Sequence, residues 1–207
     1  MASITAYVGA YHLLVFFRAR RGREHLSFAA MCVAVVIYNV LCAALYNAAT
    51  PQQGAPWQVW QTLAIGLGGI GVMFFVADYV ALASRRVLWI LLTAFSPVVI
   101  SLAPGLQHLL ITNEPQVKHI SLPLGVEITY NEMAIGPVFT YEGAMSFAVF
   151  GYAFLLGSRL YRQGQRDRAV PLVWATALFC VGGVNDALVS QGVYGFIYLS
   201  EYAFMAL

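Results

Sequence analysis

Four acidic side chains lie inside apolar stretches of the sequence, where an ionised group finds few partners. They are Asp78, Glu142, Asp186 and Glu201. A charged group near the centre of a membrane-spanning helix costs roughly 2.5–3.5 kcal/mol on insertion scales, so each acid needs a partner, a water-filled cavity or a function. Asp78 has the simplest account, because it lies about two helical turns before Arg85 and Arg86 and can pair with them at the membrane surface.

The other three acids belong to a group of polar residues that we expect to line one outward-facing pocket. A tight turn at Gln191-Gly192 joins the apolar stretches that carry Asp186 and Glu201, so these two acids should lie in the same half of the bundle. The candidate ligand-binding residues are Asn39, Tyr46, Asn47, Glu142, Asn185, Asp186, Tyr198, Glu201 and Tyr202. Such a pocket can bind a small-molecule ligand or a proton. The alternative is a hydrogen-bond network that serves only helix packing.

Catalytic chemistry finds little support in the sequence. No two of the four histidines, His12, His25, His108 and His119, have the i, i+4 spacing of a helical metal site. The chain contains no nucleophile elbow, P-loop or dinucleotide-binding fingerprint. The single lysine, Lys118, lies outside the apolar stretches, which disfavours a retinal Schiff base. We therefore expect no enzyme activity, no cofactor and no bound metal in this region.

The apolar stretches that carry these residues are typical of membrane-spanning helices. The chain has 207 residues, of which 60% are hydrophobic and 10% charged, with a mean hydropathy of +0.73. This composition excludes an ordinary soluble domain. A hydrocarbon core about 30 Å thick needs roughly 17–25 residues of helix, a length that several stretches reach. The sequence predicts an all-α membrane protein, a single domain over residues 1–207 with seven transmembrane helices near 2–17, 26–48, 57–83, 87–102, 140–160, 170–190 and 193–207.

Two features interrupt or shape this pattern. Pro97 should kink the fourth helix, because proline removes a backbone donor. The long connection 105–141 contains strand-like stretches at 116–121 and 126–130, around a turn at 122–125, and these predict a small β-hairpin between the fourth and fifth helices.

In the third helix, the small-residue spacing of Gly66, Gly68, Gly69 and Gly71 predicts close helix packing.

The arginines predict which way the bundle is inserted. All of them lie in alternate loops, after the first, third and fifth helices: Arg18, Arg20, Arg21, Arg23, Arg85, Arg86, Arg159, Arg162, Arg166 and Arg168. Basic residues near helix ends are retained on the cytoplasmic side of a membrane. We therefore expect the N-terminus and the hairpin outside, and the C-terminus in the cytoplasm.

The seventh apolar stretch is shorter than the others. Residues 193–207 would form roughly 22 Å of helix, which is less than a full crossing, and no basic residue follows them. We expect that this helix is truncated and that the natural protein continues into a cytoplasmic output domain.

The scattered polar positions resemble those of one known family. Four stretches resemble the N-terminal sensor regions of bacterial signalling proteins. They are the segment 11–28 (YHLLVFFRARRGREHLSF), Leu45-Tyr46-Asn47, Val184-Asn185-Asp186 and Tyr198-Leu-Ser-Glu-Tyr202. These regions are similar to seven-transmembrane receptors with diverse intracellular signalling modules. The resemblance implies a multi-pass sensor in the bacterial inner membrane, joined in cis to a histidine kinase, PAS or diguanylate cyclase module of a two-component or related pathway. This chain departs from the family pattern in having no such module.

Three hypotheses for function follow. The leading one is a sensor in which a ligand or proton binds the outer pocket and shifts the seventh helix, to which a cytoplasmic enzyme responds. The second is a small transporter that carries a solute or protons through the acidic pocket. The third is a structural anchor that dimerises an enzyme. The expected partners are the lipid bilayer, the unidentified ligand or proton, the kinase or cyclase module and a second copy of the chain, with no nucleic acid among them.

Overall fold

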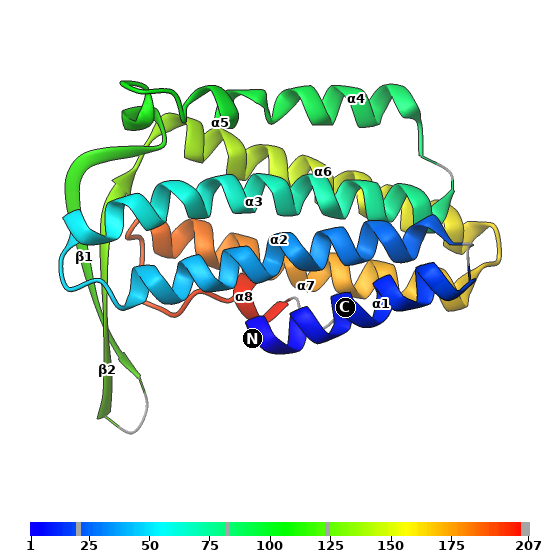
Figure 1. Cartoon of the computed structure of the whole chain (residues 1–207), viewed down its shortest axis with the longest axis horizontal. Coiled ribbons are helices and arrows are strands. Elements are labelled where there is room, and N and C mark those ends of the chain that lie inside the picture. The colour runs from blue at the N-terminus through cyan, green and yellow to red at the C-terminus, as the bar shows by residue number, and fades with distance from the viewer. Residues whose placement is uncertain (20–21, 82, 123–124, 204–207) are drawn as a thin grey trace.

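A bundle of helices with a β-hairpin at one end forms the body of the protein (Figure 1). The computed structural model describes residues 1–19, 22–81, 83–122 and 125–203. The helices run side by side along the long axis of the molecule, and the hairpin stands across their ends. The protein is therefore mostly helical, as the sequence predicts, with one small antiparallel sheet.

Five long helices confirm the first, second, third, fifth and sixth predicted stretches. They are α1 (Ala2–Ala19), α2 (Arg23–Tyr46), α3 (Pro51–Val80), α6 (Pro137–Arg162) and α7 (Arg166–Ser190). Within the described part of the chain, α2, α3, α6 and α7 are long and apolar enough to cross a membrane. α3 begins earlier than predicted because the Thr50 hydroxyl accepts a hydrogen bond from the Gln53 amide and Pro51 suits the first helical position.

The fourth predicted helix is broken, as Pro97 suggests. It consists of α4 (Arg85–Ala94) and α5 (Ser96–Ile100), which meet at Phe95. Phe95 is buried and packs with Leu91, Met73 and Val149, so the break lies on the bundle side of this element. A short 3₁₀ turn, η1 (Gln107–Leu109), leads from α5 into the hairpin.

The hairpin confirms the predicted strands and extends both. Strand β1 (Ile111–Leu122) pairs antiparallel with β2 (Val126–Ile135). The side chain of Gln58 in α3 pairs with the backbone of Met133 in both directions, each hydrogen bond being 2.9 Å long. The Asn131 side chain also donates to the carbonyl oxygen of Ala48 at 3.0 Å. These amide bonds fix the hairpin to α3 and to the turn that precedes it.

The described arginines gather at the end of the bundle opposite the hairpin. The turns that join α1 to α2, α3 to α4 and α6 to α7 all lie at that end (Figure 1). Arg168 donates to the carbonyl oxygen of Tyr79 at 2.5 Å and lies over its ring. Asp78 makes no ion pair with Arg85 or Arg86, because the one ion pair among the described residues is Lys118–Glu132. Arg20 and Arg21 lie outside the described residues.

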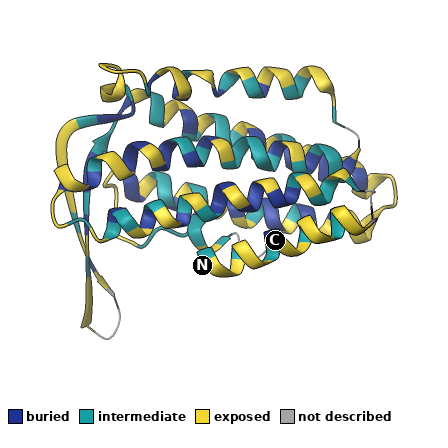
Figure 2. Ribbon diagram, viewed as in Figure 1, coloured by how far each residue is buried: buried dark blue, intermediate teal, exposed yellow. Residues whose placement is uncertain are grey.

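The outer surface of the bundle is apolar. Burial follows the inner faces of the helices, whereas the outward faces are exposed (Figure 2). Exposed side chains include Val33, Ile37, Val40, Phe154, Leu155, Trp174 and Val181. Such a surface suits contact with lipid, and helices in lipid associate through close packing of small residues. A Cβ atom on Gly71 would lie 3.0 Å from the Cα atom of Met31, which confirms the predicted close packing there.

The predicted seventh helix is wrong over most of its described length. After α7 the chain turns at Gly192, whose φ is 71°, and runs without helix to Leu199. Only the short helix α8 (Ser200–Ala203) forms, and residues 204–207 lie outside the described part. We call residues 191–203 the C-terminal segment. It turns back from the hairpin end, and α8 lies part-way along the bundle (Figure 1).

Candidate functional site

Two adjacent side chains of α7 hold the backbone of the C-terminal segment. The amide of Leu199 donates to Asp186 Oδ1 at 2.6 Å, and the amide of Ser200 donates to Asp186 Oδ2 at 3.0 Å. Asn185 donates to the carbonyl oxygen of Ile197 at 2.9 Å and to Asp186 at 2.9 Å. Backbone groups in an apolar bundle need partners, and here α7 supplies them in place of a continuous helix. This is why the helical prediction fails at residues 193–199.

The backbone of α7 also makes room for the segment. A Cβ atom on Gly182 would lie 3.2 Å from both the backbone nitrogen and the Cα atom of Ser200. Tyr194 at the start of the segment donates from its hydroxyl to Asn185 Oδ1 at 2.5 Å. Gly182, Asn185 and Asp186 therefore fix the position of the segment along about one turn of α7.

Glu201 connects the segment to α2. Its carboxylate accepts a short hydrogen bond from the hydroxyl of Tyr46. The ring of Tyr46 packs at a tilt against that of Tyr130 in the hairpin, with 5.0 Å between the ring centres. Tyr130 in turn packs at a tilt against Tyr198, with 5.2 Å between the ring centres. The pKa of Tyr130 is raised to about 12, mainly by burial and secondly by the nearby negative charge of Glu201. The three rings thus join α2, the hairpin and the segment through neutral phenols.

A buried ion pair ties the hairpin to the same segment, and the sequence analysis missed it. Lys118 Nζ lies 2.6 Å from Glu132 Oε2, and both side chains are almost fully buried. Lys118 also donates to the Tyr198 hydroxyl at 3.0 Å, and that hydroxyl donates to Glu132 at 2.8 Å. Lys118 Nζ also donates a hydrogen bond of 3.3 Å to the carbonyl oxygen of Ser190 at the end of α7. The cluster joins both strands, α7 and the C-terminal segment.

The register of the hairpin could have revealed this pair. Lys118 lies opposite Tyr130, so Glu132 is its diagonal neighbour, and diagonal neighbours on one face are within reach of a long side chain. The predicted second strand ended at Tyr130, which left Glu132 outside it. The five residues of β2 that follow Tyr130 show no strand-like pattern in the sequence.

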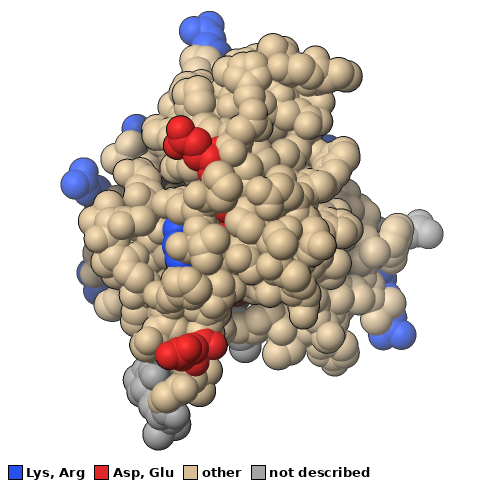
Figure 3. Space-filling view, turned by 90° about the vertical axis from the view of Figure 1, so that its left-hand side faces the viewer, with Lys and Arg blue, Asp and Glu red and all other residues tan. Residues whose placement is uncertain are grey.

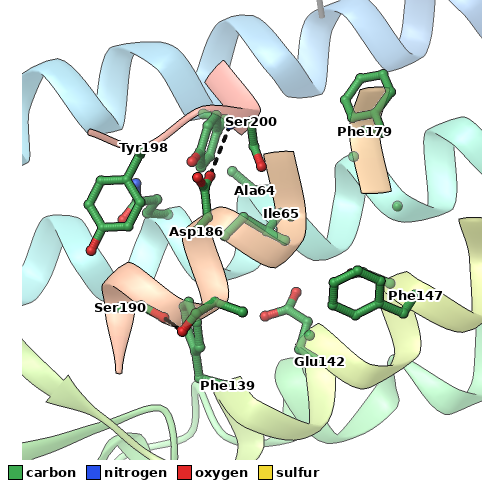
Figure 4. Close-up of a pocket in the computed structure, with 18 of the residues that line it drawn as sticks. Ala64, Ile65, Phe139, Glu142, Phe147, Phe179, Asp186, Ser190, Tyr198 and Ser200 are labelled. Carbon is green, nitrogen blue, oxygen red and sulfur yellow. Dashed lines mark hydrogen bonds between the residues drawn. The ribbon is translucent and has the colours of Figure 1, made fainter. Parts of the chain in front are cut away.

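A cavity of about 210 Å³ lies between α3, α6 and α7, and the C-terminal segment forms part of its wall (Figure 4). Its lining is mostly apolar, with the rings of Phe139, Phe147, Phe150 and Phe179 among it. Asp186, Tyr198 and Ser200 contribute from the side of the segment, and Glu142 points in from α6. A pocket that is mainly apolar and holds a few polar groups suits a small organic ligand.

The predicted site residues fall into three groups. One group meets along the C-terminal segment and consists of Asn185, Asp186, Tyr198, Glu201 and Tyr46. Glu142 and Asn39 are buried, and neither side chain has a hydrogen-bond partner among the described residues. Tyr202 and Asn47 are exposed, and the Asn47 amide caps α2 by donating to Ala43 at 2.7 Å. The predicted pocket therefore holds Asp186, Tyr198 and Glu142, whereas Asn47 and Tyr202 face away from it.

The hairpin end of the bundle carries few charges. Most atoms on this face belong to neither acidic nor basic residues (Figure 3). Lys118 is neutralised by Glu132, and both side chains are almost fully buried. The charge of the molecule is thus concentrated at the opposite end, among the arginine-bearing turns.

Comparison with known proteins gives one finding. The sequence pattern of the family described as 7TM diverse intracellular signalling matches residues 1–207. No curated protein and no solved structure matches the chain.

The contacts of Asp186 predict how the C-terminal segment responds to its loss. In Asp186→Asn, only the amide oxygen can accept, so one of the two backbone amides loses its acceptor. A hydrogen bond to a charged group contributes about 1.5–3 kcal/mol, so amide exchange in the peptide 193–203 should accelerate roughly ten- to a hundredfold. Hydrogen exchange with mass spectrometry measures this, and Asp78→Asn serves as the control. Equal exchange in all three proteins would show that Asp186 does not hold the segment.

Proposed function

This chain belongs to the 7TM diverse intracellular signalling family, and on that premise we propose that it detects a small ligand in the cavity and transmits the event through its C-terminal segment. It is a multi-pass membrane protein, and its family is a sensory membrane domain rather than a catalytic one. The proposal extends this family assignment to a particular cavity and a particular moving part.

One observation carries the proposal: the C-terminal segment is both a wall of the cavity and the part of the chain that turns back toward the arginine-bearing end. Tyr198 and Ser200 line the cavity, and Ser200 is also bound to Asp186. A ligand that contacts these residues changes the free energy of the segment's position, and only such a difference can shift a conformational equilibrium. Movement of the segment then passes to whatever the chain joins on that side.

We propose that the arginine-bearing end faces the cytoplasm of a bacterial cell and that the hairpin faces outward. Basic residues near helix ends are retained inside, and the described arginines all lie at one end of the bundle. The segment runs from the hairpin end toward this end. A histidine kinase or cyclase module in cis would then receive the signal in the cytoplasm.

Transport through the same cavity has weaker support. A cluster of buried hydrophobic side chains lies between α3, α6 and α7, made of Val76, Val80, Ala153, Leu156, Leu160, Ala169 and Leu172. A solute that entered the cavity would have to separate this packed layer to reach the arginine-bearing end. The sensor proposal needs no such passage.

Labelling of single cysteines tests the proposed orientation. Glu127 in β2 and Gln163 after α6 are exposed at opposite ends of the bundle. With Cys32, Cys42 and Cys180 replaced by alanine, a membrane-impermeant maleimide should label Glu127→Cys in intact cells and Gln163→Cys only after permeabilisation. The reverse pattern would refute the orientation and the outward-facing cavity with it.

A wedge between α7 and the segment tests transmission. A reporter diguanylate cyclase joined after Leu207 would report the position of the segment as cyclic di-GMP in cells. Gly182→Val places methyl groups against the backbone of Ser200, whereas Gly151→Val places them where no atom lies within 4 Å. Coupling energies between sites are typically 1–3 kcal/mol, so the first variant should change the output roughly fivefold or more. The control variant should leave it unchanged. Equal output from both variants, at equal membrane levels, would contradict the proposal.

A further inference from the structure

The cavity contains one carboxylate that has no partner among the described residues. Three carboxylates line it, those of Glu132, Asp186 and Glu142. Glu132 is neutralised by Lys118, and Asp186 accepts the amides of Leu199 and Ser200. Glu142 is 1% exposed, and neither of its oxygens has a hydrogen-bond partner among the described residues. Its side chain points into the cavity from α6 (Figure 4).

The fold leaves room for this carboxylate on both sides. A Cβ atom on Gly66 of α3 would lie 2.8 Å from Glu142 Oε1, so glycine at that position makes space for the acid. One turn further along α6, the buried hydroxyl of Ser146 also has no partner in the described part of the chain, and Ser146 lines the same cavity. An unpaired carboxylate in a medium of low dielectric constant is costly, which favours a cationic partner. The described Lys and Arg residues make no ion pair with it.

The remaining walls favour an aromatic or aliphatic body behind that cation. Phe139 and Phe147 lie on either side of Glu142 in Figure 4, and Phe179 lines the cavity further away. A ring placed among these side chains gains stacking as well as burial. Phenyl faces also attract a cation directly. The volume of about 210 Å³ is below the roughly 300–1,000 Å³ of sites for drug-sized molecules, so the occupant is small.

We propose that the cavity binds a small apolar amine in its protonated form, with the ammonium group on Glu142 and Ser146 and the apolar body among the phenylalanine rings. The inference rests on the proposed function, because it names the ligand class of the same site. The ammonium group donates one hydrogen bond to the Glu142 carboxylate and a second to the hydroxyl oxygen of Ser146. No covalent step is involved.

The probe is 2-phenylethylamine, with 2-phenylethanol as a neutral molecule of nearly the same shape. Binding of each to the full chain is measured by calorimetry in phosphatidylcholine nanodiscs at neutral pH, with empty nanodiscs as the reference. The wild-type protein should bind the amine at least tenfold more tightly than the alcohol. Loss of one partner of a buried charge pair should weaken amine binding in Glu142→Gln by roughly thirtyfold, while alcohol binding stays the same.

Two further variants keep the test independent of folding. Gly143 lines the cavity, and a Cβ atom there would meet nothing within 4 Å. Gly143→Leu therefore adds a side chain to the cavity wall and should abolish binding of both compounds. Gly151→Leu, on the same helix but outside the cavity lining, should bind both compounds as the wild type does.

Several results would overturn the inference. They are equal binding of amine and alcohol by the wild type, unchanged amine binding in Glu142→Gln, or uptake that empty nanodiscs reproduce. Failure of the sensor proposal is distinguishable from these outcomes. If the amine binds through Glu142 but leaves the output of the cyclase fusion unchanged, the amine site stands and the sensor proposal fails.

Discussion

The structure depends on how the C-terminal segment satisfies its backbone inside an apolar bundle. A chain that enters a bilayer normally forms a continuous helix, because every peptide group needs a partner there. In this protein the side chains of Asn185 and Asp186 bond instead to residues 197, 199 and 200. The segment therefore lies along α7 as a separate element, attached by a few bonds. Such an element can change position more easily than a helix packed along its whole length.

The charges of the site follow from the same constraint. Lys118 and Glu132 compensate each other and orient Tyr198, while Tyr46 provides a hydroxyl for Glu201. Each of these contacts joins the segment to a different part of the fold, namely the hairpin or α2. Glu142 differs from them because no described residue completes it. In the sensor proposal, the C-terminal segment is the wall of the cavity that moves, and Glu142 is the acid to which the ligand binds.

Part of this arrangement could be predicted from the sequence. Hydropathy located the five long helices because bilayer thickness sets their length, and Pro97 correctly marked a break. The polar residues Asn185, Asp186, Tyr198 and Glu201 were found because polar groups are conspicuous in apolar stretches. The seventh helix could not be predicted correctly, since hydropathy does not reveal that side chains of α7 replace helical hydrogen bonds. Asn47 looked like a pocket residue, whereas its side chain bonds to the end of α2; an asparagine can serve in either place, so its type alone does not distinguish them.

The proposed transmission depends on the attachment of the C-terminal segment to α7. Trp174 in α7 and Tyr202 in the C-terminal segment both have exposed side chains and can carry spin labels. Double electron–electron resonance then measures the distance between the two labels in lipid bilayers. The account predicts one narrow distance distribution in the otherwise unchanged protein. A broader or displaced distribution should appear when Asn185→Ala and Asp186→Ala are combined. A distribution that stays narrow and unshifted in the double variant would contradict it.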